Sequence, residues 1–264
     1  MDELEVQGLR IAYERAGVGP PLVLLHGFVG DSREWRRQLD GLSDEFTVVA
    51  WDAPGSGRSA DPPSSFRMPE YADCLAGFVN ALGLGVPHVA GLSFGGALAL
   101  ELFRRHPAVP RTLVLAGAYA GWAGSLPPDV VEERLLLSLR SADLPPDEFA
   151  GTMIRSMFSV TAPPEILDGF AAIMSEFHPV GFRSMVRSLA EADLRDVLPS
   201  VDVPTLLLYG DEDVRAPLSV AETLHAAMPT SRLIVMPGVG HMSSVEAGER
   251  FNAEVRTFLR PVGA

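Results

Sequence analysis

The amino-acid sequence predicts an α/β fold, built on a mostly parallel eight-stranded sheet flanked by helices, with a helical segment inserted late in the chain. Three observations support this prediction. Short apolar runs bounded by turn residues recur along the chain, amphipathic stretches lie between most of them, and one long interval contains no strand-like run. The length of 264 residues suits one large α/β domain or a core that carries an insertion.

The strands are expected in two groups. Near the N-terminus, Leu4–Gln7 and Arg10–Glu14 alternate apolar and polar residues and are expected to pair antiparallel at the edge of the sheet. The later apolar runs are continuous, which is typical of parallel strands covered on both faces. These runs are Leu22–Leu25, Phe46–Ala50, His88–Gly91, Arg111–Ala116, Pro204–Tyr209 and Arg232–Met236.

Helical spacing of apolar residues predicts helices between the strands, among them Tyr71–Leu82, Phe94–Arg105 and Val220–Met228. This alternation favours right-handed crossovers between parallel strands. Residues 121–195 carry Leu, Met and Phe at helical spacing, and pairs of prolines would break that segment into short helices. We therefore expect a core of residues 1–120 and 196–264, with residues 121–195 inserted after the sixth strand as a helical cap.

Composition narrows the class of partner. The chain has 34 acidic and 21 basic residues and a formal net charge of −13, which disfavours nucleic acid and anionic lipid. The acidic N-terminus lacks the features of a secretory signal, and no apolar stretch approaches the ~18 residues of a membrane span. We expect a cytoplasmic monomer or homodimer that acts on a small molecule and contacts neither nucleic acid nor membrane. The single cysteine, Cys74, is expected to be a buried thiol.

A nucleophile is predicted at Ser93. The sequence Gly91-Leu92-Ser93-Phe94-Gly95 follows an apolar strand and precedes a helix rich in small residues. A serine on a tight strand-to-helix turn keeps its hydroxyl exposed, and only small neighbours two positions away let the two backbones approach. The amino terminus of the helix adds the positive end of its dipole beside the reacting carbon.

A serine hydroxyl needs a base near neutral pH, and histidine is the residue type whose pKa suits that role. His241 follows the last predicted strand through a flexible loop, at the sheet edge where ligands bind in open α/β folds. The residues after it, Ser243–Glu246, look like a capping box that starts the final helix. We therefore predict His241 as the base. Structural roles suit four other histidines, which are His88, His106, His178 and His225.

The base in turn needs a carboxylate at its second ring nitrogen. The loop Gly210-Asp211-Glu212-Asp213 follows the predicted strand Pro204–Tyr209. On this reasoning three carboxylates remain candidates.

The ordered set of Ser93, an acid of this loop and His241 resembles the α/β-hydrolase family. The resemblance implies the α/β-hydrolase fold and makes Asp213 the acid, because the family's acid commonly stands three residues after the glycine that ends the strand; Asp211 is the alternative. His26-Gly27-Phe28 looks like the family's oxyanion loop. This similarity implies that the backbone amides of Phe28 and Phe94 stabilise the oxyanion and that His26 has a structural role.

The stretch Asp52–Ser59 is similar to the family's sharp turn after its fourth strand. It also contains a formal dinucleotide fingerprint, but Asp61-Pro62-Pro63 follows it instead of a helix start, so we expect no bound cofactor. No cluster of cysteine and histidine residues has metal-ligand spacing, so we also expect no metal.

A serine at position 93, where relatives that open epoxides or remove halides carry a carboxylate, favours hydrolysis of carboxylic esters or lactones through an acyl-enzyme. The alternatives are carbon–carbon bond hydrolysis of a diketone, perhydrolase or acyltransferase activity on the same residues, and a receptor that binds a small molecule without turnover. The substrates are expected to be small and largely apolar. The residues expected to line the pocket are Trp122, Met157, Phe158, Phe177, Val214 and Met242.

Overall fold

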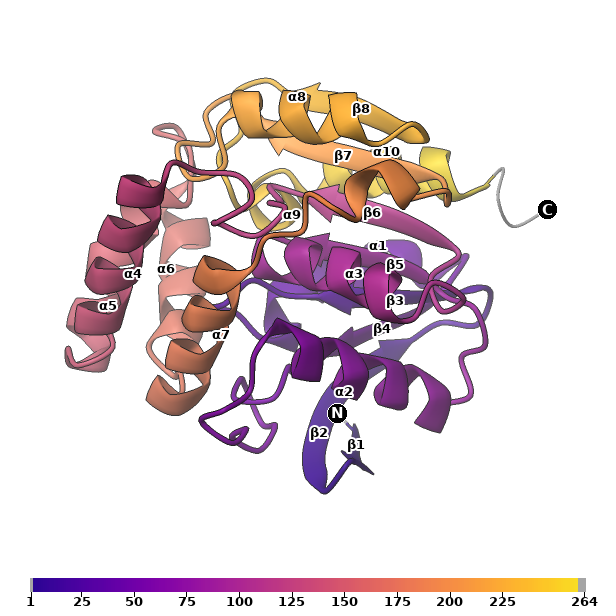
Figure 1. Ribbon diagram of the computed structural model, residues 1–264, viewed down its shortest axis with the longest axis horizontal. Coiled ribbons are helices and arrows are strands. Elements are labelled where there is room, and N and C mark those ends of the chain that lie inside the picture. The colour runs from indigo at the N-terminus through magenta and orange to yellow at the C-terminus, as the bar shows by residue number, and fades with distance from the viewer. Residues whose placement is uncertain (1, 261–264) are drawn as a thin grey trace.

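One eight-stranded sheet forms the centre of the molecule, as Figure 1 shows for the computed structural model, which describes residues 2–260. The strand order is β1-β2-β4-β3-β5-β6-β7-β8. Strand β2 pairs antiparallel with β1 and β4, and all other neighbouring strands pair parallel. The strands are β1 (Asp2–Val6), β2 (Leu9–Ala16), β3 (Pro21–Leu25), β4 (Thr47–Trp51), β5 (His88–Leu92), β6 (Thr112–Ala116), β7 (Thr205–Gly210) and β8 (Ser231–Met236).

The predicted fold class is confirmed, because each of the six continuous apolar runs given above coincides with one of these strands to within one residue. In β4, β5, β6 and β7 every residue is buried, as expected for parallel strands covered on both faces. The two N-terminal strands, with their alternating pattern, form the predicted antiparallel edge pair.

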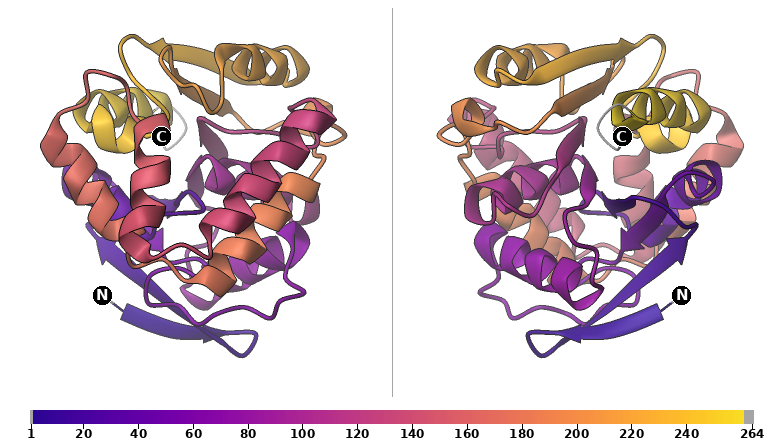
Figure 2. Two further views of the ribbon diagram at one scale, coloured as in Figure 1. Left: turned by 90° about the vertical axis from the view of Figure 1, so that its left-hand side faces the viewer. Right: turned by 90° about the vertical axis from the view of Figure 1, so that its right-hand side faces the viewer.

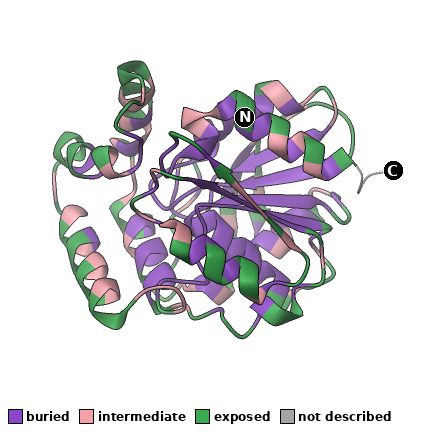
Figure 3. Ribbon diagram, turned by 90° about the horizontal axis from the view of Figure 1, so that it is seen from above, coloured by how far each residue is buried: buried purple, intermediate pink, exposed green. Residues whose placement is uncertain are grey.

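Helices cover both faces of the sheet (Figure 3). On one side α2 (Met68–Ala81) packs against α3 (Phe94–Arg105), and on the other α1 (Arg36–Leu42) packs against α10 (Gly248–Leu259). Cys74 of α2 is fully buried, and burial raises the pKa of its thiol to about 12. No helix within residues 2–260 is long and apolar enough to cross a bilayer. Apart from the inserted helices, which are described next, the remaining helical elements are α8 (Leu218–Ala227), α9 (Ser243–Glu246), η1 (Ser32–Trp35) and η3 (Leu198–Ser200).

Four helices between β6 and β7 lie together at one side of the molecule (Figures 1 and 2). Each of them begins at a proline, a residue that suits the first helical position because the amide it lacks would have no partner there. The proline pairs therefore start three of these helices as well as separating them, and the single Pro179 starts the fourth. The helices are α4 (Pro128–Ser141), α5 (Pro146–Met153), α6 (Pro164–Met174) and α7 (Pro179–Glu191), with the short η2 (Ile154–Ser156) between α5 and α6.

These helices pack onto the sheet side of the molecule mainly through α7, which contacts α2 and α3. The Trp122 amide, just after β6, donates to the Leu189 carbonyl of α7 at 2.8 Å. The buried apolar residues of both parts form one continuous cluster. The division into a core and a separate cap with the boundaries given above therefore stays a prediction.

The predicted capping box at Ser243–Glu246 is wrong. Helix α9 has Met242 at its N-cap without a side-chain hydrogen bond, and the final helix α10 begins only at Gly248. The Glu246 carboxylate instead accepts hydrogen bonds from the backbone amides of Ser159, at 3.2 Å, and Gly240, at 3.0 Å. Glu246 thus ties the loop before His241 to the segment between η2 and α6.

We predict that Gly181→Ala destabilises the protein by about 1–3 kcal/mol, the usual cost of overpacking. A Cβ atom at Gly181 of α7 would lie 2.0 Å from the carbonyl oxygen of Gly55, in the turn after β4. Gly169→Ala in α6 is the control, since a Cβ atom there meets nothing within 4 Å and should stabilise the helix by up to ~1 kcal/mol. Urea denaturation measures both, and equal effects would contradict the close packing of α7.

Candidate active site

The turn at Ser93 is held in an unusual backbone conformation between β5 and α3. Ser93 has a φ of 55° and a ψ of −110°. Within the described chain, the non-glycine residues with positive φ are Ser93 and Gln7. Such a conformation costs on the order of 1–3 kcal/mol and persists only when its surroundings enforce it. Here the Ser93 amide donates to the Ala116 carbonyl at 2.8 Å, and the Ser93 carbonyl accepts from Gly96 and Ala97 at 3.0 and 3.1 Å.

The glycines around Ser93 are required by close backbone contacts. A Cβ atom at Gly91 would lie 2.2 Å from the Gly95 carbonyl oxygen. A Cβ atom at Gly95 would lie 2.1 Å from the carbonyl oxygen of Leu25, at the end of β3. The first turn of α3 can therefore lie directly against the loop that follows β3, and Ser93 comes close to His26-Gly27-Phe28.

Asp213 and His241 form a buried pair. Their side chains are 1% and 3% exposed, and His241 Nδ1 lies 2.8 Å from Asp213 Oδ2. The other carboxylate oxygen, Oδ1, accepts hydrogen bonds from the backbone amides of Arg215 and Ala216, each at 2.8 Å. Both carboxylate oxygens therefore have partners, and the acid is fixed in orientation before it meets the imidazole.

Asp211, the alternative acid, is exposed and accepts a hydrogen bond from the Gly238 amide at 2.6 Å. It joins the loop after β7 to the loop after β8 and makes no hydrogen bond to His241. Gly117, after β6, packs on the Asp213–His241 pair: a Cβ atom there would lie 3.0 Å from His241 Nδ1 and 3.2 Å from Asp213 Oδ2. Three strand ends therefore meet at this pair.

Ser93 and His241 line one small cavity, together with Phe28, Met157, Arg215 and other residues. The volume open to the centre of a water molecule is only about 10 Å³, so the cavity holds about one water. Among the described residues the Ser93 hydroxyl makes no hydrogen bond to His241. Such contacts are often loose without substrate and tighten when substrate binds.

The backbone amides of Phe28 and Phe94 meet the requirements for stabilising an oxyanion in two respects. Both residues are buried, with exposures of 4% and 1%. Neither amide donates a hydrogen bond to any residue from 2 to 260. A buried amide without a partner is costly, and an oxyanion beside Ser93 would supply the missing acceptor.

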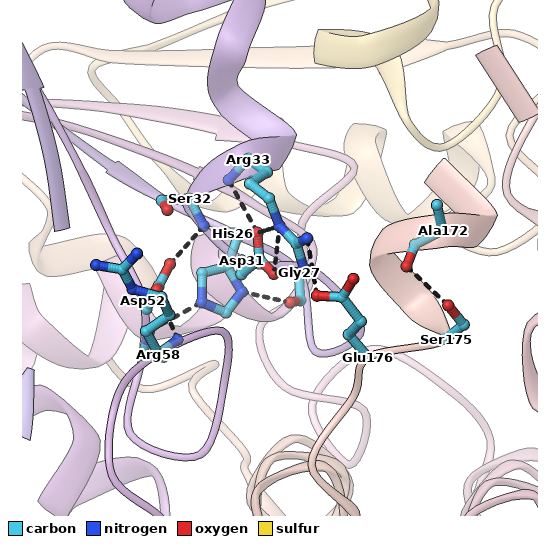
Figure 4. Close-up of polar contacts among 11 residues, drawn as sticks. His26, Gly27, Asp31, Ser32, Arg33, Asp52, Arg58, Ala172, Ser175 and Glu176 are labelled. Carbon is cyan, nitrogen blue, oxygen red and sulfur yellow. Dashed lines mark hydrogen bonds and ion pairs between the residues drawn. The ribbon is translucent and has the colours of Figure 1, made fainter. Parts of the chain in front are cut away.

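The loop after β3 is held by the polar network in Figure 4. His26 Nδ1 donates to the Gly27 carbonyl at 2.7 Å, and Nε2 accepts from the Ala53 amide at 2.9 Å. Burial lowers the pKa of His26, which favours the neutral ring that these two contacts require. The ring connects the loops that follow β3 and β4, so its contacts are structural.

The same network joins the inserted helices to the β3 loop. Asp31 pairs with Arg33 at 2.7 Å, and the Arg33 guanidinium also reaches Glu176, after α6, at 2.9 Å (Figure 4). Asp52 accepts hydrogen bonds from the Ser32 amide at 2.7 Å and the Arg58 amide at 2.9 Å. The turn after β4 and the loop after β3 are thereby fixed against each other.

Of the six residues predicted to line the pocket, Met157 and Met242 line the cavity that contains Ser93 and His241, and Val214 lines a neighbouring cleft. The other three pack elsewhere. Trp122 meets Phe28 edge to face, with ring centroids 6.2 Å apart. Phe158 packs on Phe170, and Phe177 stacks on Phe149 with centroids 3.8 Å apart.

Sequence reasoning missed two polar residues of the cavity. Glu34 is 4% exposed, accepts a hydrogen bond from the Gly27 amide at 3.4 Å, and has no partner for Oε1 within the described chain. Burial raises the pKa of Glu34 well above its ordinary value of 4.5. Arg215 lines the cavity as well. Arg215 follows Asp213 by two residues, and that position was the available signal; no sequence pattern marks Glu34.

No group of three or more potential ligands within residues 2–260 could hold a metal ion. The polar atoms of the cavity belong instead to the hydroxyl, imidazole, carboxyl and guanidinium groups already described. This arrangement can deprotonate an alcohol beside two unpaired amides.

Comparisons with known proteins find relatives along nearly the whole chain. Residues 22–254 match a family model described as the alpha/beta hydrolase family. A protein of Pantoea ananatis, named provisionally as a carbamate hydrolase, is 30% identical over 90% of this chain and 88% of its own. A 2-hydroxymuconate semialdehyde hydrolase of Pseudomonas sp. (strain CF600) is 29% identical over 99% of this chain and 94% of its own. A thermophilic esterase from Thermogutta terrifontis superposes with a TM-score of 0.92 at 30% identity, covering 100% of both chains.

We predict that Glu34→Gln becomes increasingly stabilising as pH rises above about 4.5. A carboxyl whose pKa is raised by folding contributes stability below its unfolded pKa and loses it as pH rises toward the folded pKa. The difference in unfolding free energy between variant and wild type should widen by up to about 1.4 kcal/mol per pH unit in that window. Denaturation from pH 4 to 8 measures it, with exposed Glu222→Gln as the control for loss of one carboxylate. A constant difference would mean that Glu34 is ionised in the folded protein.

Proposed function

The chain belongs to the alpha/beta hydrolase family, and from this premise we propose that it is a serine hydrolase that cleaves carboxylic esters or lactones through an acyl-enzyme on Ser93. One observation carries the proposal. The buried Asp213–His241 pair, with a 2.8 Å contact, opens onto the same cavity as the Ser93 side chain.

In the proposed first step, His241 Nε2 takes the proton of the Ser93 hydroxyl as its oxygen attacks the ester carbonyl carbon. Asp213 Oδ2 accepts from Nδ1, which fixes the ring tautomer and stabilises the imidazolium that forms. The amides of Phe28 and Phe94 donate to the developing oxyanion. The ester C–O bond then breaks, and His241 returns the proton to the departing alcohol oxygen.

In the second step, a water molecule gives a proton to His241 and its oxygen attacks the acyl carbon. The bond to Ser93 breaks, the serine oxygen regains the proton, and the carboxylic acid leaves. The cavity has room for about one water molecule, which is the co-reactant that this step needs.

Substrate entry requires the cavity to open. Met157 and Arg215 line it on the side of the inserted helices, and both are side chains that can adopt other rotamers. An ester is far larger than one water molecule, so these side chains, or the helices that carry Met157, must move when substrate binds.

Carbon–carbon bond hydrolysis is the second candidate. It is favoured by the similarity to a 2-hydroxymuconate semialdehyde hydrolase along 99% of the chain. Carbamate cleavage would use the same oxyanion chemistry, as would perhydrolase or acyltransferase activity with peroxide or another alcohol in place of water. A panel of esters, lactones, carbamates and diketones separates these reactions. Tight binding without turnover of any of them would indicate a receptor instead.

We predict that Ser93→Ala and His241→Ala each lower kcat/KM for a nitrophenyl ester by several powers of ten, up to about a millionfold, because the groups act as a unit. His225→Ala is the matched control, since His225 is exposed and hydrogen-bonds Ser231 far from the cavity. Near-normal turnover in either of the first two variants would refute the assigned role.

We also predict that Asp213→Asn lowers kcat on the order of ten-thousandfold, because an amide at this position favours the wrong imidazole tautomer. Asp211→Asn should change kcat far less, since Asp211 contacts the Gly238 amide and not His241. Steady-state kinetics on both variants tests the assignment. The reverse order of effects would make Asp211 the acid.

A further inference from the structure

A second cavity lies beside the one that contains Ser93. It is an outer cleft of about 430 Å³, lined by residues of α4, α5, η2 and the loop after β7. Arg215 lines both cavities and so forms part of the wall between them. Arg134 of α4 lines the outer cleft as well.

The Arg215 guanidinium has only neutral partners. Its Nη1 donates to the Ser156 hydroxyl at 2.7 Å, and its Cζ lies 5.8 Å from the centre of the Phe28 ring. Burial lowers the pKa of Arg215, because it removes water from around the charged guanidinium. The guanidinium therefore retains donors that a ligand can use.

Arg134 is in the same situation. It donates to the Tyr119 hydroxyl at 3.2 Å and to the Arg215 carbonyl at 3.0 Å, and its Cζ lies 6.0 Å from the centre of the Trp122 ring. Neither Arg134 nor Arg215 forms an ion pair with any residue between positions 2 and 260. Two like charges are thus held close together without an ion-pair partner, and the carboxylate whose charge favours that of Arg215, Asp213, is already paired with His241.

This lack of an ion-pair partner is notable in a chain with a net charge of −13. No aspartate or glutamate lines the outer cleft. The carboxyl that lines the inner cavity is Glu34, and burial raises its pKa, which disfavours the charged form that would repel an anion. A partly buried cation without a partner is costly, and a bound anion would offset that cost.

The rest of the cleft is open to solvent and combines apolar side chains with the hydroxyl groups of Ser138, Ser141, Thr152 and Ser156. Leu137 is 54% exposed and Val214 is 69% exposed, and both line the cleft beside Met153. The volume lies in the range of small-molecule sites, which combine apolar walls with a few convergent polar groups. A short aliphatic chain that ends in an anion fits this description.

We propose that the outer cleft is the subsite for a carboxylate of the substrate, which binds Arg215 and Arg134. The inference rests on the proposed function: the bond cleaved at Ser93 belongs to an ester whose far end carries the carboxylate, as in a half-ester of an aliphatic dicarboxylic acid. The guanidinium matches the planar carboxylate with two parallel hydrogen bonds. Arg215, in the wall between the cavities, orients the ester toward Ser93.

Matched substrates test the proposal. The 4-nitrophenyl half-esters of adipic, suberic and sebacic acid are compared with the same compounds whose free carboxylate is capped as a methyl ester. For at least one chain length, kcat/KM should be about tenfold to a hundredfold higher for the anionic member of the pair, the usual worth of charged hydrogen bonds. Added salt should reduce this ratio.

Variants locate the anion subsite. Arg215→Met and Arg134→Met should each reduce the anionic-to-capped ratio of kcat/KM by about tenfold, and Arg215→Lys should restore part of it. Arg155→Met is the matched control, because Arg155 is an exposed arginine of η2 that lines neither cavity. It should keep the wild-type ratio. Thermal unfolding confirms that each variant is folded.

Binding gives a readout that does not need turnover. Calorimetry on the Ser93→Ala protein should show that monomethyl adipate binds more tightly than dimethyl adipate, and that Arg215→Met removes the difference. Equal kcat/KM for every anionic and capped pair, with turnover that depends on Ser93, would overturn the anion subsite and leave the serine hydrolase intact. Carboxylate-dependent binding without turnover of any ester would keep the subsite and refute the proposed reaction. Neither binding nor turnover would refute both.

Discussion

The hydrogen bond between Asp213 and His241 is the constraint on which the candidate site depends. It joins two residues that are 28 positions apart, on loops that follow β7 and β8, at 2.8 Å and out of contact with solvent. Two backbone amides hold the second carboxylate oxygen, so the acid cannot rotate away from the imidazole. The lack of a side chain at Gly117 leaves room for the pair at the end of β6. Parallel strands bring these loops to one edge of the sheet, where Ser93 is held in its strained turn.

The inserted helices complete the site. The Met242 amide, next to His241, donates to the Met157 carbonyl at 2.9 Å, and Glu246 holds the Ser159 amide at 3.2 Å. Arg33 connects the loop after β3 to Glu176 on the far side of the same helices. The cavity is therefore closed by segments that are also tied to the loops after β3 and β8, and on the proposed function a substrate enters only when some of these contacts loosen. Arg215 connects the loop after β7 to the inserted helices. Its backbone amide donates to Asp213 Oδ1, and its guanidinium donates to the Ser156 hydroxyl of η2.

Much of this could be predicted from the sequence, because local sterics determine it. Gly95 fits against β3 only as glycine, and short continuous apolar runs bounded by turn residues are typical of strands covered on both faces. The remainder depends on tertiary packing. Phe177 stacks on Phe149 instead of lining the cavity, and Glu246 binds the Ser159 amide instead of capping a helix. In both cases the fold brings a partner from a distant part of the sequence into contact with the side chain. Nothing in the sequence marks Glu34 as buried, because glutamate is almost never buried unless its carboxyl is paired, and Glu34 Oε1 has no partner in the described chain.

Covalent labelling with a fluorophosphonate tests the central claim most directly, because this electrophile reacts with a serine only where a base and an oxyanion site activate its oxygen. Intact-mass measurement followed by peptide mapping should find one adduct, on Ser93, and labelling should be lost in Ser93→Ala and strongly slowed in His241→Ala. A folded protein that stays unlabelled, or that carries its adduct on a different residue, would contradict the account of this site.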